Sequence, residues 1–177
     1  SIPGFGKTKA TKLVSVKLIA SQLAKYIDKN NLDSPAIVGH SLGGFLAYYM
    51  GIHYPNKVGK IISVDGLPYI APIFTRNNNT QISDVITNAE LLKSRYQNMS
   101  QEQMLFISKS TINIQAKSKE SQQKVLNMIG LSDPKTVGMF MYELMTTDLR
   151  ADIQNIKKPI LLLGASGGFN SQSEHQF

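Results

Sequence analysis

The sequence lacks cysteine altogether and has no long hydrophobic run, and each absence removes a class of protein. Without cysteine the chain has no disulfide scaffold, no thiolate metal site and no cysteine nucleophile. Its three histidines are scattered, so we expect no metal centre, and no motif predicts a cofactor. No apolar stretch approaches the ~18 residues of a bilayer-spanning helix, so no membrane span is predicted.

The composition is that of a globular protein. The 177 residues are 42% hydrophobic and 18% charged, which supplies a core of ordinary size. The formal net charge of +7 raises the question of a nucleic-acid or anionic-membrane partner. Because the lysines are dispersed and aromatic residues do not alternate with them, a solvated basic surface is the favoured interpretation, and no nucleic-acid partner is expected.

Strands and helices alternate in the first part of the chain. Apolar spacing predicts an amphipathic helix over 12–29 and a second helix over 42–53. Short apolar runs predict buried strands over 35–38 and 58–64. This alternation predicts an α/β fold with a parallel sheet that has helices on its faces.

The middle of the chain has a different character. From about 83 to 150 the pattern is helical throughout. Ser100 and Gln103 fit a capping box, and Asp133 before Pro134 fits a helix start. A further buried-strand pattern returns at 160–163.

A G-x-S-x-G pentapeptide, Gly39-His40-Ser41-Leu42-Gly43, is the strongest chemical signal. It lies between an apolar strand and an amphipathic helix, which is the context that a nucleophile elbow requires. We expect Gly39 and Gly43 to be needed because a Cβ at either would meet neighbouring backbone. The N–H of Leu42 is placed to bind an oxyanion. The alternative is a glycine-rich turn with an incidental serine.

At this point the chain resembles the α/β-hydrolase superfamily. The segments that carry the resemblance are AIVGHSLGGFLAYYMGIHYPNKVGKIISVDG, PGFGKT and IKKPILLLGA. The resemblance implies a serine hydrolase with a partial α/β-hydrolase core over 1–66, an all-helical cap insertion over 67–150, and a return to the core over 151–177.

Three departures from the family pattern suggest an internal fragment. The family's His-Gly oxyanion loop precedes the loop at which this chain begins. No carboxylate follows the strand at 160–163 before Glu174, and no further strand precedes a catalytic histidine. We therefore expect the 177 residues alone to be inactive.

One carboxylate and three histidines are the candidates for the remaining catalytic roles. Asp65 follows a predicted strand, and some branches of the superfamily take their acid there; a simple Asp-Gly turn with Gly66 is an equal alternative. His40 is expected to line the pocket or pack, and His53 to end a helix. His175 lies in the terminal tail and is a poor candidate, so the catalytic histidine is expected outside this chain.

A near-match to a phosphate-binding loop at residues 1–8 is rejected, because Pro3 removes an N–H where donors are needed. The sequence therefore predicts hydrolysis of an ester or amide of a small, largely apolar molecule through a Ser41 acyl-enzyme. The alternatives are an aminopeptidase-like member of the same superfamily and a non-catalytic binding module that retains the elbow. The substrate's identity, the compartment and the oligomeric state are left open.

Overall fold

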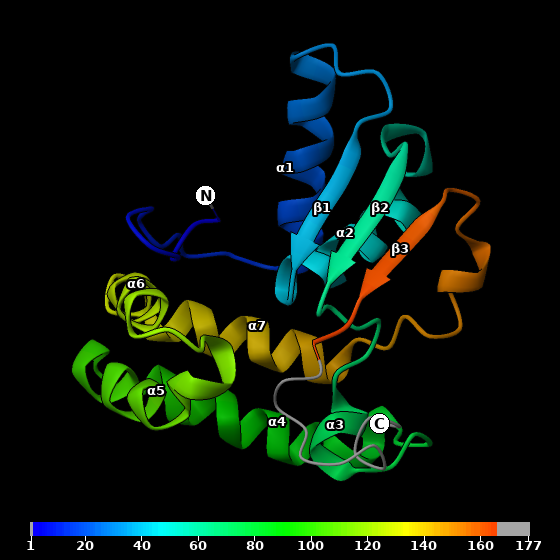
Figure 1. The fold of residues 1–177 in the computed structure, drawn as a ribbon. Helices are drawn as coiled ribbons and strands as arrows, with labels where there is room; N and C mark the ends of the chain where they lie inside the picture. Colours follow the sequence, from blue (N-terminus) through cyan, green and yellow to red (C-terminus); the bar gives the residue numbers. More distant parts are fainter. Residues whose placement is uncertain (1, 166–177) are drawn as a thin grey trace. The chain divides into compact units, whose positions relative to one another are not determined.

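The computed structural model describes residues 2–165 (Figure 1). By its contacts the chain forms two compact units. A helical unit comprises residues 1–14 and 87–142, and a sheet unit comprises 15–86 and 143–177. The division into a core over 1–66, a cap over 67–150 and a return to the core over 151–177 stays a prediction.

The sheet unit is built on three parallel strands in the order β1-β2-β3. They are β1 (Ala36–His40), β2 (Lys60–Val64) and β3 (Ile160–Leu163). The register pairs His40 with Val64, and Val64 with Leu163, so the carboxyl ends of the three strands lie level (Figure 1). The predicted α/β fold with a parallel sheet is confirmed.

Helix α2 (Leu42–His53) packs against β1 and β2 and supplies much of the core of the sheet unit. Its Phe45 and Met50 are fully buried, as is Ile61 on β2. Because β-strand side chains alternate between faces, Ile61 and Ser63 share the buried face of β2. A single residue, Ser41, separates the end of β1 from the start of α2.

Helix α1 (Val16–Lys29) begins four residues later than the sequence pattern predicted. Ser15 is the reason: it has an extended backbone, and its side chain accepts a hydrogen bond from the Leu18 N–H (3.1 Å). The carboxylate of Glu143 accepts from the Val16 N–H (2.6 Å), which satisfies a second free donor of the first turn. Two acceptors thus define the start of the helix.

Short elements complete the sheet unit. The 3-10 turn η1 (Pro55–Lys57) precedes β2, helix α3 (Ala71–Thr75) follows it, and the 3-10 turn η2 (Ile153–Asn155) precedes β3. Strand β2 is two residues shorter than the strand predicted over 58–64, since residues 58 and 59 link η1 to it.

Arg150 and Asp148 form an ion pair in the segment before η2. Arg150 donates to both carboxylate oxygens of Asp148 at 2.6–3.1 Å and to the carbonyl of Thr80 (2.8 Å). Its guanidinium also lies over the ring of Tyr69, 4.7 Å from the centroid. One side chain therefore joins residues about 70 positions apart in the sequence.

The helical unit contains α5 (Gln101–Gln115), α6 (Lys119–Ile129) and parts of α4 (Ile82–Gln97) and α7 (Pro134–Thr146). The capping box of Ser100 and Gln103 is confirmed, with both reciprocal bonds present. Asp133 accepts from the Thr136 N–H (2.8 Å) at the start of α7, as predicted. No helix of the described residues is both long and apolar enough to cross a bilayer.

The N-terminal loop docks onto the start of α7 within the helical unit. The Asp133 N–H donates to the carbonyl of Gly4 (2.7 Å), and the Gly6 N–H donates to the Ser132 hydroxyl (3.2 Å). The Gly4 N–H in turn donates to the carbonyl of Thr8 (3.0 Å). The N–H groups of Gly4 and Gly6, which a phosphate-binding loop would present, are therefore occupied by protein acceptors.

Candidate active site

A tight turn between β1 and α2 carries Ser41. Its φ of 51° and ψ of −116° form a backbone conformation that non-glycine residues rarely adopt. The Ser41 N–H donates to the carbonyl of Val64 (2.9 Å), and the Ser41 carbonyl accepts from Gly44 (2.9 Å) and Phe45 (3.1 Å). The neighbouring strand and the first helical turn thus hold the strained residue from two sides. Its side chain is exposed and makes no capping bond.

Glycine is required at two places around this turn, and one differs from the prediction. A Cβ on Gly39 would overlap the carbonyl of Gly43 and lie 2.6 Å from the nitrogen of Gly44. A Cβ on Gly43 would meet nothing within 4 Å, so the expected collision at Gly43 is wrong. It is Gly44 that faces β2: its Cβ would overlap the Ser63 hydroxyl and lie 2.9 Å from the Cα of Gly66.

The first turn of α2 follows Ser41 directly. Leu42 is the first residue of this 12-residue helix, so its N–H has no acceptor within the helix. The positive end of the helix dipole lies at the same point. Leu42 and Ser41 therefore bring a free N–H and an exposed hydroxyl together in consecutive residues.

Asp65 leaves β2 at the same level at which Ser41 leaves β1, since His40 pairs with Val64. Its φ is 50°, again in the left-handed region. Its N–H donates to the carbonyl of Leu163 (2.7 Å), and its Oδ1 accepts from the N–H of Ala165 (3.2 Å). Although the loop after β3 begins without a carboxylate, that of Asp65 reaches it from the adjacent strand.

The structure brings neither described histidine into a hydrogen bond with Ser41. His40 is the exposed last residue of β1. His53 is the last residue of α2, and its ring packs against that of Tyr49 at 4.1 Å between centroids. His175 lies outside the described residues. Within residues 2–165 no group of three carboxylate or imidazole side chains gathers in a way that could hold a metal ion.

Comparison with known proteins shows which family the chain belongs to. The family described as "alpha/beta hydrolase fold" matches residues 1–168. The chain belongs to the alpha/beta hydrolase family. The resemblance noted at the elbow thus extends over nearly the whole chain of this alpha/beta hydrolase, the helical segment included.

Two curated relatives illustrate the range of similarity. A pimeloyl-[acyl-carrier protein] methyl ester esterase of Vibrio atlanticus is 26% identical over 166 residues, which is 92% of this chain and 62% of the relative. The abhydrolase domain-containing protein abhd-5.2 of Caenorhabditis elegans is 36% identical over 70 residues, covering 36% of this chain and 16% of its own length. The chain thus spans less than two thirds of the relatives it matches.

Solved structures agree on the fold. An esterase from Exiguobacterium antarcticum superposes with a TM-score of 0.73 at 18% identity, covering 94% of this chain and 62% of the esterase. A thermophilic esterase from Thermogutta terrifontis also gives 0.73 at 18% identity, with 94% and 60% covered. At this identity the likeness shows the alpha/beta hydrolase fold alone.

Sequence reasoning missed a buried support beneath the elbow of this alpha/beta hydrolase. The Ser63 hydroxyl is fully buried and donates to the carbonyl of Gly66 (2.8 Å). Gly66 in turn lies so close to the turn that a Cβ there would be 2.8 Å from the Ser41 carbonyl oxygen. A serine inside the apolar run of β2 was the available signal, because a buried hydroxyl needs a partner.

Proposed function

We propose that this alpha/beta hydrolase cleaves an ester or amide of a small, largely apolar molecule through an acyl-enzyme on Ser41. The strained and exposed position of Ser41 at the carboxyl end of the sheet is the observation that carries the proposal. A strain of about 1–3 kcal/mol is maintained there by hydrogen bonds from two elements. A turn in which the serine were incidental would not require this strain.

The Leu42 N–H would serve as one oxyanion donor. In acyl transfer the substrate carbonyl oxygen becomes negative as the Ser41 Oγ bonds to the carbonyl carbon. A free N–H at a helix N-terminus stabilises that charge without reorganisation. The elbow residues Gly39 and Gly44 support this role because they allow the helix to begin close to the strand.

Asp65 is our candidate for the acid. Its carboxylate lies at the carboxyl end of β2, beside the strand that carries Ser41, and one of its oxygens is oriented by the Ala165 N–H. A carboxylate so held can orient an imidazole and stabilise it when it takes the Ser41 proton. The imidazole would come from outside residues 2–165.

An ester is the favoured substrate class. The curated relatives that cover most of this chain are methyl ester esterases acting on an acyl group carried by a protein. An apolar acyl chain with a small alcohol leaving group fits the proposed chemistry, and we carry the ester, but not the particular acyl group, over to this chain.

A fluorophosphonate probe tests the proposal. In a preparation that hydrolyses p-nitrophenyl butyrate, the probe is expected to label Ser41, and Ser41→Ala should lose both labelling and turnover. Ser110→Ala is the matched control, because Ser110 is an exposed serine on α5 and should leave both unchanged. Labelling and turnover that persist in Ser41→Ala would overturn the assignment, because the nucleophile would then be another residue.

A further inference from the structure

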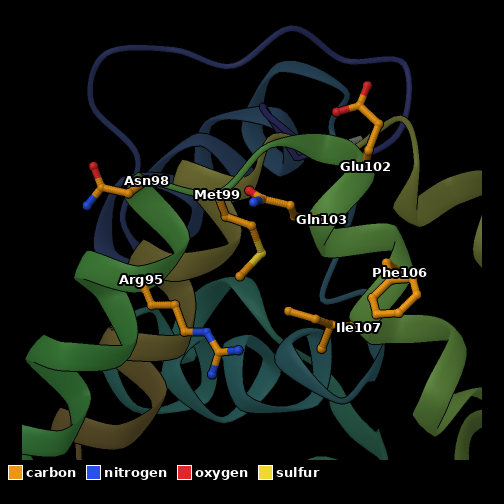
Figure 2. A pocket seen from close by; sticks show the side chains of 7 residues that line it. All are labelled: Arg95, Asn98, Met99, Glu102, Gln103, Phe106 and Ile107. Atoms are coloured by element: carbon orange, nitrogen blue, oxygen red, sulfur yellow. The ribbon is translucent and has the colours of Figure 1, made fainter.

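The helical unit contains a groove between the end of α4 and the start of α5 (Figure 2). Its volume is about 640 Å³, within the range of sites that hold small organic ligands. Figure 2 shows the side chains of Arg95 from α4, Met99 from the link between the helices, and Gln103 and Ile107 from α5, extending toward the space between the helices. The proposed chemistry at Ser41 makes no use of these residues.

The wall formed by α5 is apolar and accessible. Phe106 is 78% exposed and Ile107 is 37% exposed. Both line the groove together with Met99, so the groove presents three apolar side chains. Contiguous exposed apolar surface on a folded protein commonly marks a binding site, and methionine adapts its shape to an apolar ligand.

One side of this wall is held in place. The Gln103 Oε1 accepts from the Ser100 N–H (2.8 Å), while the Gln103 N–H donates to the Ser100 hydroxyl (3.2 Å). The capping box therefore fixes the Gln103 side chain and leaves its amide NH₂ free to donate. The groove is thus partly organised before any ligand arrives.

Arg95 gives the groove its charge. Across residues 2–165 its guanidinium has no ion pair or hydrogen bond to another side chain. In Figure 2 the Arg95 guanidinium turns into the groove, whereas the carboxylate of Glu102, which also lines it, points away. A single unpaired guanidinium matches a single carboxylate, which it can hold with two parallel N–H···O bonds.

The charge of the helical unit supports an anionic ligand. Residues 1–14 and 87–142 contain ten lysines and arginines against four acidic residues, a formal charge of +6. The sheet unit has nine against eight, a charge of +1. The net positive charge that looked dispersed along the sequence therefore belongs mostly to one unit, and a unit of this charge favours an anionic ligand over a cationic one.

We propose that the groove binds a medium-chain fatty acid. Its carboxylate would pair with Arg95, and its alkyl chain would cover Met99, Ile107 and Phe106. A neutral alcohol of the same length would lack the charged contact, and a short acid such as acetate would lack the apolar one. This is a binding proposal, and it does not depend on the proposed hydrolysis.

Calorimetric titration of the 177-residue chain with decanoate, below its micelle concentration, tests the proposal. We expect saturable 1:1 binding, with decanol and acetate at least tenfold weaker. Arg95→Gln should weaken decanoate binding by about tenfold to a hundredfold, because a charge-assisted pair is lost. Lys109→Gln is the matched control: it removes an exposed cation from α5 that does not line the groove and should leave the affinity unchanged.

The site of binding is checked by methyl NMR on methionine- and isoleucine-labelled protein. Decanoate should shift the Met99 and Ile107 methyl signals, and should do so equally in Ser41→Ala, which separates this groove from any product site at the elbow. Unchanged affinity in Arg95→Gln, or shifts confined to residues near Ser41, would overturn the proposal. Binding to vesicles of anionic phosphatidylglycerol without binding of free decanoate would also overturn it and assign the surface to a membrane.

Discussion

Ser41 and Asp65 leave two neighbouring strands at the same level, and both do so with a left-handed φ of about 50°. The Ser41 N–H bonds to the carbonyl of Val64, the residue before Asp65, so the two turns are hydrogen-bonded through one peptide group. A serine and a carboxylate are thereby placed side by side on the edge of the sheet where alpha/beta proteins place their ligands. Their adjacency is a property of the strand register and not of any side-chain contact.

Gly44→Ala is expected to destabilise the protein, while Gly43→Ala should not. The new methyl group at position 44 would overlap the Ser63 hydroxyl and crowd Gly66, whereas the one at position 43 would meet open space. Overpacking of this kind costs about 1–3 kcal/mol. Urea denaturation of the two variants beside the wild type measures the difference. Equal loss of stability in both would contradict the geometry.

Asp65→Asn should lower kcat by about 10⁴ in a preparation active on p-nitrophenyl esters, if Asp65 orients the catalytic imidazole. The asparagine Oδ1 can still accept from the Ala165 N–H, so the melting temperature should change little. Asp33→Asn is the control, since Asp33 is an exposed residue of the loop before β1. Full activity in Asp65→Asn would show that Asp65 is only a turn residue.

Arg150→Ala should lower the free energy of unfolding by about 1–3 kcal/mol, because it leaves Asp148 and the Thr80 carbonyl without their donor. Lys124→Ala removes a cation from the highly exposed pair with Glu120 and should cost little. Chemical denaturation of both variants gives the comparison. If Lys124→Ala and Arg150→Ala lowered the free energy of unfolding equally, the contacts of Arg150 would stabilise the fold no more than an exposed ion pair does.

The same ion pair predicts a loss of stability in acid. Burial alone would raise the pKa of Asp148, but the hydrogen bonds and charge of Arg150 outweigh it and lower the pKa below 3.8. Because the folded-state pKa is depressed, the contribution of Asp148 is present above pH 3.8 and is lost as the pH falls through the folded value. Asp148→Asn should reduce this part of the acid dependence.

Glu143→Gln should change the pH dependence of stability in the opposite sense. Burial raises the pKa of Glu143 above 4.5, and the hydrogen bond from the Val16 N–H lowers it only in part. A raised carboxyl pKa contributes stability that is present below pH 4.5 and is lost as the pH rises through the folded value. Glutamine keeps an acceptor for Val16 but does not titrate, so the variant should gain stability relative to the wild type between pH 4 and 7. Parallel melting curves across that range would refute the prediction.

The 177 residues on their own are expected to show no Ser41-dependent turnover. Among the described residues neither His40 nor His53 has a hydrogen bond to Ser41, and a general base contributes about 10²–10⁴-fold to such reactions. The measurement is p-nitrophenyl butyrate hydrolysis by the chain beside Ser41→Ala. Turnover that depends on Ser41 would point to His175 as the base, and His175→Gln would then have to abolish it.

Local patterns allowed the elbow and the parallel strands to be predicted from the sequence. The order of an apolar strand, G-x-S-x-G and an amphipathic helix is encoded within about 20 consecutive residues, and so is the capping box at Ser100. The identity of the crowded glycine was not encoded in this way. Whether Gly43 or Gly44 faces β2 depends on the rotation of α2 against the sheet, which only packing determines.

Contacts between distant segments escaped prediction for the same reason. The Asp65 carboxylate bonds to Ala165, 100 residues later, and Arg150 bonds to Thr80, 70 residues earlier. No periodicity relates these positions, because tertiary hydrogen bonds follow from the arrangement of the elements and not from the sequence near either partner. The groove at Arg95 likewise depends on how α4 and α5 diverge after residue 97.

The backbone conformation of Ser41 also affects the stability of the fold. A residue at φ 51° and ψ −116° would be accommodated more easily as glycine, since no Cβ would then oppose the conformation. The exposed serine side chain packs nothing and caps nothing, so folding alone gains nothing from it. Ser41→Gly should therefore be more stable than the wild type by about 1 kcal/mol. The hydrolysis proposed for Ser41 would account for a side chain that weakens the fold it belongs to, in the way that activity and stability oppose each other at many enzyme sites.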